Sequence, residues 1–162
     1  MSREYTISAG GITLANQPVT LIGIRPNTNC ALEILHMWIS QSANATSVQQ
    51  RVECGLQVST YPTVVAATPA KLKQGDPVSQ ITGGTALAAG TCGINASAEG
   101  AGAKSPIVQS AFNAVNGWDW QPTPDETIVL SPASASSFYL YLPVAALTLT
   151  NWAFGLVYKE IG

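Results

Sequence analysis

Hydrophobic side chains recur at every second residue along much of this chain, which is the pattern of a β-strand with one buried face. The clearest case is Gln49–Thr60, where Val52, Cys54, Leu56 and Val58 alternate with charged or polar residues and one glycine. An amphipathic helix would instead place apolar residues at intervals of three and four. The segment therefore predicts a half-buried strand that shows its other face to solvent.

The C-terminal end of the chain alternates in the same way, over about residues 148–161. Trp152, Phe154, Leu156 and Tyr158 fall on one face of the predicted strand. The opposite face is also mostly apolar, so both sides need cover. We therefore expect a central strand at this end of the chain.

Turn-forming residues divide the rest of the chain into shorter apolar segments. With the strands above and the segment Cys30–Ser40, they predict about eight strands at the spacing of an antiparallel β-sandwich. The further predicted strands are Tyr5–Ser8 and Gly11–Leu14 as an N-terminal hairpin or arm, Val19–Ile24, Pro106–Gln121, Glu126–Ser131 and Ser136–Val144.

The segment Cys30–Ser40 is the one place where helix and strand compete. Its 11 residues could form three helical turns, and Ala31, Leu32, Glu33 and Leu35 favour a helix. Predicted loops bound the segment and its neighbours are predicted strands, so we interpret it as a strand.

Two regions do not have a strand pattern, and the whole chain, residues 1–162, is interpreted as a single domain. Residues 61–78 contain three prolines and predict a long crossover with one helical turn near Ala70–Leu72. Residues 82–104 are rich in glycine and alanine and predict a surface insertion, although Cys92–Ala98 alternates weakly and could form a strand. Residues 1–12 are a candidate N-terminal arm.

Charge is scarce, because 7 Lys and Arg and 9 Asp and Glu make up only 10 % of the 162 residues. An average soluble protein has about 25 %. The net charge of −2 offers no basic patch for phosphates, so nucleic acid is excluded as a partner. Residues 127–158 carry no charge but are interrupted by serine, proline and asparagine, so no membrane span and no secretory signal are predicted.

The cysteines and the single histidine do not form a recognisable catalytic or metal-binding pattern. Cys30, Cys54 and Cys92 are widely spaced and predict three reduced, buried thiols. His36 lies within an apolar predicted strand, so we interpret it as structural rather than as a general base. We therefore predict that the chain is not an enzyme and has no catalytic residue, cofactor or metal site.

One short motif has the character of a binding site. Trp118 and Trp120 flank Asp119, and alternation in a strand puts both indoles on the same face. They could fill the sandwich core or an oligomer interface. Alternatively, they could form an exposed platform for sugar rings or for a partner protein.

The order of these segments along the chain resembles a family of jelly-roll proteins of tailed bacteriophages, the capsid decoration or cement proteins. The resemblance is carried by the succession of segments rather than by a short motif. It rests on Ile12–Ile22, Ala31–Ser40, Arg51–Thr60, Lys71–Pro77, Trp118–Pro122 and Trp152–Ile161.

The resemblance implies a jelly-roll-like, all-β antiparallel sandwich that binds the outer capsid surface of a virion as a homotrimer, after synthesis in the host cytoplasm. Its partner would be the major capsid protein, and its role would be to stabilise the shell. The alternative is a carbohydrate- or receptor-binding module of a phage tail or head fibre. Candidate residues for the partner or trimer interface are Tyr5, Ile7, Ile12, Trp118 and Trp120.

Overall fold

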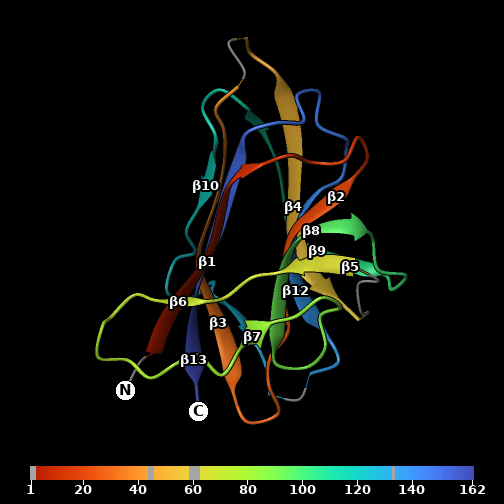
Figure 1. Ribbon diagram of the computed structural model, residues 1–162. Coiled ribbons are helices and arrows are strands. Elements are labelled where there is room, and N and C mark those ends of the chain that lie inside the picture. The colour runs from red at the N-terminus through yellow and green to blue at the C-terminus, as the bar shows by residue number, and fades with distance from the viewer. Residues whose placement is uncertain (1–2, 44–45, 59–62, 133) are drawn as a thin grey trace.

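The computed structural model describes residues 3–43, 46–58, 63–132 and 134–162. Within these residues the chain forms two β-sheets that pack face to face and no helix (Figure 1). All strand pairs are antiparallel except the short β7–β8 pair. The predicted all-β antiparallel sandwich is therefore confirmed. The helical turn predicted near Ala70–Leu72 is wrong, because Ala70–Lys71 forms a short strand.

The first sheet, sheet A, has β13 at its centre, between β3 and β1. A central position for the C-terminal strand is thus confirmed, although the strand begins at Trp152 rather than near residue 148. Two short strands, β10 and β11, pair with the outer edge of β3. In spatial order, sheet A consists of β10 (Trp118–Trp120) with β11 (Ile128–Leu130), β3 (Ala31–Gln41), β13 (Trp152–Ile161), β1 (Arg3–Ile12) and β6 (Ala70–Lys71).

The second sheet, sheet B, has β2 and β12 at its centre and β9 at one margin. The short strand β7 pairs with β8 outside the main path. In spatial order, sheet B consists of β5 (Thr63–Ala66), β8 (Thr91–Ala98) with β7 (Thr82–Gly83), β2 (Val19–Ile24), β12 (Ser137–Leu142), β4 (Gln49–Gln57) and β9 (Lys104–Asn113).

Eight of these strands have the connectivity of a jelly roll. Taken in chain order they are β1, β2, β3, β4, β9, β10, β12 and β13. In sheet A the neighbours are β1, β13, β3 and β10, which are the first, eighth, third and sixth of these strands. In sheet B the neighbours are β2, β12, β4 and β9, which are the second, seventh, fourth and fifth. The described residues form 13 strands rather than about eight. Four of the additional strands come from the long connection between β4 and β9, and β11 extends the edge formed by β10.

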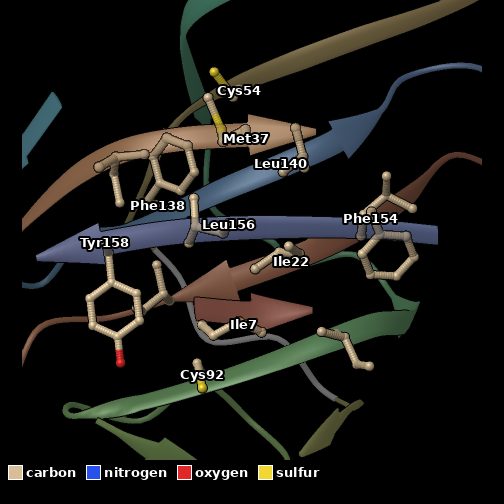
Figure 2. Close-up of a cluster of buried hydrophobic side chains, with 14 of the residues drawn as sticks. Ile7, Ile22, Met37, Cys54, Cys92, Phe138, Leu140, Phe154, Leu156 and Tyr158 are labelled. Carbon is tan, nitrogen blue, oxygen red and sulfur yellow. The ribbon is translucent and has the colours of Figure 1, made fainter. Parts of the chain in front are cut away.

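The hydrophobic core lies between the two sheets (Figure 2). Ile22 of β2 and Leu140 of β12 contribute from sheet B, and Met37 of β3 and Leu156 of β13 from sheet A. All four side chains are fully buried. Full burial of such a side chain contributes roughly 1.5–3 kcal/mol, so this layer is the main source of stability.

Several predicted boundaries agree with the structure and others do not. Val19–Ile24 forms β2 as predicted, and Cys30–Ser40 is a strand rather than a helix. The strand predicted over Gln49–Thr60 ends at Gln57, and the side chain of Val58 is 62 % exposed instead of buried. The segment predicted as one strand over Pro106–Gln121 is divided, because its two halves belong to different sheets.

The two regions singled out as an arm and an insertion both contribute strands. Arg3–Ile12 is one continuous strand, β1, between β13 and β6, so the predicted hairpin is wrong. Within residues 82–104, the weakly alternating segment forms β8, which pairs with β2 and β5. The connection that contains β5 to β8 crosses between the two sheets in the lower half of Figure 1.

Candidate functional site

The outer face of sheet A, the side turned away from the core, carries the most distinctive set of side chains in the molecule. The register places Asp119, Trp38, Gly155 and Ser8 in one row across four strands. The next row contains His36, Val157 and Thr6. All except Gly155 are half-buried or exposed. We refer to these seven residues as the outer platform.

Trp38 is the largest side chain of the outer platform. Its six-membered ring covers the backbone of Gly155 so closely that a Cβ atom there would overlap it. The imidazole of His36 packs beside the indole, with ring centroids 5.3 Å apart. Glycine at position 155 therefore allows an aromatic ring to lie against the sheet.

His36 also bonds to Asp119, which reaches the outer platform from β10. The distance from His36 Nε2 to Asp119 Oδ2 is 2.8 Å, and the two side chains are 33 % and 70 % exposed. Asp119 thus orients the ring and ties the short strand β10 to β3. Among the described residues, no hydroxyl or thiol hydrogen-bonds to this imidazole, so the pair lacks the nucleophile of a hydrolytic triad.

A shallow hollow of about 260 Å³ lies next to Trp38. Ser40, Asn116 and Asp119 provide its polar groups, and Trp38 and Trp118 its aromatic ones. Sites for small polar ligands commonly combine apolar surface with a few polar groups. The hollow therefore has the composition of a weak ligand site.

The charged residues beside the outer platform occur as ion pairs. Lys159 Nζ lies 3.1 Å from Glu33 Oε2, and Lys73 Nζ lies 3.5 Å from Glu4 Oε2. Both pairs belong to the end of the sheet at which β1 begins. Within the two rows that form the outer platform, the only ionisable side chains are those of His36 and Asp119.

Trp118 and Trp120 do not belong to the outer platform. They pair with Ile39 and Met37 on the inner side of sheet A, and both indoles pack against the core while remaining half-buried. The prediction that the two share a face is confirmed. Both indoles therefore take part in core packing, and their role at a partner or trimer interface stays a prediction.

The N-terminal candidates also face inward. Tyr5 is fully buried and Ile7 is 1 % exposed, so their side chains are not available to a partner in this structure. Ile12 is half-buried and packs against the same core. Trp38, which the sequence pattern did not single out, is half-buried and lies on the outer face of sheet A.

On sheet B, a polar network fastens the end of the glycine-rich segment. Glu99 accepts hydrogen bonds from the backbone N–H and the hydroxyl of Thr20, both at 2.6 Å. Lys104 Nζ lies 2.9 Å from Glu99 and 4.4 Å from the centroid of the Tyr141 ring. Burial, followed by the charges of Glu99 and Glu53, raises the pKa of Tyr141. The network holds residues 99–104 against the sheet.

A second polar network is buried beside β13, the central strand of sheet A. The hydroxyl of Ser79 lies 2.7 Å from that of Tyr158 and donates to Glu160 Oε1 at 2.6 Å. The backbone N–H of Gln80 donates to the same carboxylate oxygen at 2.8 Å. Burial is the main cause that raises the pKa of Tyr158. These bonds fix residues 79–80 to β13, so this hydrogen-bonded network has a structural role.

The cysteines are buried and free, as predicted. Burial raises the pKa of Cys54 and of Cys92 to about 12 and also raises that of Cys30. Thiols with such values are not nucleophiles at neutral pH. Within the part of the chain that the structure describes, no three His, Cys, Asp or Glu side chains gather as metal ligands.

No family model, no curated protein and no solved structure matches the chain. The described residues contain no helix that is long and apolar enough to cross a membrane. The class of the protein is therefore defined by its own geometry, as an all-β sandwich with jelly-roll connectivity and an aromatic outer platform.

Proposed function

We propose that this protein is a structural component of a bacteriophage particle, a decoration or cement protein that binds the outer capsid surface as a homotrimer and stabilises the shell. The observation that carries the proposal is the outer platform, where Trp38 and Val157 lie beside the small, uncharged residues of β1 and β13 and beside one ion pair, His36–Asp119. The jelly-roll connectivity supports it, because viral capsid domains frequently have this architecture.

The part of the outer platform on β1 and β13 suits contact between copies because its desolvation costs little. Ser8, Thr6 and Gly155 bring no charge into an interface, whereas buried lysine or glutamate would require an exact partner. Trp38 supplies a large aromatic surface of the kind that dominates protein–protein contacts. A closed three-fold ring of such contacts matches a three-fold position on an icosahedral shell.

The partner in this proposal is the major capsid protein, and the role is passive. Each trimer touches several capsid subunits at once, so individually weak contacts combine into stable attachment. No catalytic group is required for this role. Acting at the virion surface, the protein would oppose separation of neighbouring capsid subunits.

Light scattering during size-exclusion chromatography, together with co-sedimentation with undecorated capsids, tests the proposal. The wild-type chain should run as a trimer and pellet with capsids. Val157→Lys, which places a charge in the platform, should shift the trimer to a monomer. Leu147→Lys is the matched control, because Leu147 is 81 % exposed and lies outside the platform. A wild-type chain that stays monomeric and does not pellet contradicts the proposal.

The hollow beside Trp38 favours a second candidate, a carbohydrate- or receptor-binding module of a phage tail or head fibre. An aromatic ring next to Ser40, Asn116 and Asp119 offers both stacking and hydrogen-bonding groups to a sugar. This places the proposed site at Trp38 instead of Trp118 and Trp120. Glycan-array binding that Asp119→Ala and Trp38→Ala abolish would support this candidate over the first.

A further inference from the structure

Strand β9 leaves one edge of sheet B open. The connection between β4 and β9 adds β8 beside β2 and β6 beside β1, so it extends the sheets on the opposite margin. On its own margin, β9 pairs with β4 alone among the described residues. A ten-residue strand with one unpaired edge is a template for another strand.

The phase of the β4–β9 ladder shows which backbone groups face this open edge. Ala114 N–H donates to the carbonyl of Val48 at 2.9 Å, and the register then alternates bonded and non-bonded pairs. Ser110 therefore bonds to β4, whereas the N–H and C=O groups of Gln109 and Ala111 point outward. The carbonyl of Asn113 also points away from β4, as this alternation requires. It accepts hydrogen bonds from the backbone N–H groups of Asn116 and Gly117 in the following turn.

Natural edge strands usually carry charges, prolines or bulges that prevent association. In β9 these devices are confined to the first half, where Lys104 and Pro106 lie and a bulge interrupts the register between Pro106 and Val108. Residues 108–113 carry no charge. Gln109, Ser110 and Ala111 are all exposed. This half of the edge is thus unprotected.

We propose that the open edge of β9 pairs antiparallel with β9 of a second copy of this chain, about a two-fold axis at Ser110. In that arrangement, Gln109 of each copy lies opposite Ala111 of the other. Their outward N–H and C=O groups then form about four backbone hydrogen bonds across the axis. The two B sheets become one continuous sheet.

Charge favours this register. Arg51 lies opposite Ala111 and Glu53 opposite Gln109, and the side chains of all four share the outer face of sheet B. With the axis at Ser110, each cross-strand row runs from Arg51 of one copy to Glu53 of the other. An axis at Ala111 would instead align Arg51 of one molecule with Arg51 of the other. An axis at Gln109 would align the two Glu53 residues. Ala111 and Gln109 lie between the two charges, so Arg51 and Glu53 interact over about three strand spacings. Within its own copy, Glu53 accepts hydrogen bonds from Gln109 and Tyr139. Opposite charges at the two ends of a row favour the pairing, and like charges disfavour it.

This edge is separate from the outer platform, which lies on sheet A. The two-fold contact can therefore form whether or not the platform mediates a trimer. If both contacts operate, the two-fold contact links one trimer to the next.

Disulfide trapping tests the proposal. Residues at position 110 form a non-hydrogen-bonded pair across the axis, with a Cα separation of about 4.5 Å that a disulfide can span. Ser110→Cys should therefore form covalent dimers under mild oxidation at least about ten times faster than Ser105→Cys. Ser105 is exposed on the same strand, but the axis would place it far from Ser105 of the second molecule. Native cysteines do not interfere because all three are buried.

A proline variant provides the second measurement. Ala111→Pro removes an N–H that faces the open edge while leaving the bonds to β4, and edge strands tolerate such a proline. When Ala111→Pro is added to Ser110→Cys, the cross-linking rate should fall to that of Ser105→Cys. In sedimentation, the variant that carries only Ala111→Pro should no longer form the two-fold dimer. Equal cross-linking rates for Ser110→Cys and Ser105→Cys, with Ala111→Pro sedimenting like wild type, would overturn the proposal.

Discussion

The indole of Trp38 covers the backbone of Gly155, its direct cross-strand partner in sheet A. The glycine is required for space and not for an unusual backbone angle, because a Cβ atom at position 155 would overlap the ring. This contact decides how the largest residue of the outer platform is presented.

Gly155→Ala should therefore destabilise the protein and displace Trp38. Overpacking of this kind costs about 1–3 kcal/mol. Urea unfolding measures the loss, and acrylamide quenching of tryptophan fluorescence should rise as the indole leaves the sheet. Gly10→Ala is the matched control, because its new methyl group would meet only Ala153 Cβ at 3.9 Å. Equal stability of the two variants would show that the ring adapts without cost.

Part of the fold follows from local patterns in the sequence. The β-branched run Val19–Ile24 is bounded by loops and forms β2 without a change of boundary. Cys30–Ser40 has helix-forming residues but forms β3, because its alternate side chains are needed in the core between the sheets. In both cases burial against other strands outweighs local propensity.

Other features depend on pairing between distant segments and have no local signal. Trp38 and Gly155 are 117 positions apart (155 − 38), and only their register in sheet A makes them neighbours. The divided segment Pro106–Gln121 changes sheet at Asn116 and Gly117, and Gly117 adopts a φ of 75°. The glycine provides the left-handed turn that other residues rarely adopt. An Asn-Gly pair is a common turn signal, but no local pattern indicates that the strands on its two sides belong to different sheets.

Glu99 should contribute more to stability than its ion-pair partner Lys104. Glu99→Ala would leave the backbone N–H of the buried Thr20 without its hydrogen bond, and it would also remove the charge that pairs with Lys104. Loss of a partly buried, charge-assisted bond of this kind costs about 1.5–3 kcal/mol. Lys104→Met keeps the apolar stem and should cost less. Urea unfolding of the two variants measures the difference, and a larger loss for Lys104→Met would contradict the assignment.

Glu160 should act as the anchor of residues 79–80. Its side chain is 3 % exposed and accepts bonds from Ser79 and from the backbone of Gln80. Glu160→Ala should destabilise the protein by about 2–3 kcal/mol and increase amide hydrogen exchange at Gln80 and Ile81. Glu33→Ala is a suitable control, because Glu33 is an outward residue of the same sheet. Unchanged exchange in the Glu160 variant would remove the anchoring role.

Alkaline pH should destabilise the fold through its buried thiols. Burial raises the pKa of Cys54 and Cys92 from 9.0 to about 12, so the folded state favours the protonated form. Below pH 9 both states are protonated and stability is unaffected. Between pH 9 and 12 the unfolded chain loses protons that the folded chain retains, so each thiol lowers the free energy of unfolding by about 1.4 kcal/mol per pH unit.

Two steps isolate the thiols in this pH dependence. Urea unfolding under reducing conditions at pH 8, 9, 10 and 11 should show a steeper decline for wild type than for the Cys54→Ala, Cys92→Ala double variant. The comparison uses slopes, so the lower starting stability of the variant does not affect it. Tyr158, whose pKa burial also raises, lowers stability above about pH 10 in both proteins and therefore cancels. Parallel slopes would mean that the thiols already ionise in the folded state, which requires water to reach the core at Cys54 and Cys92.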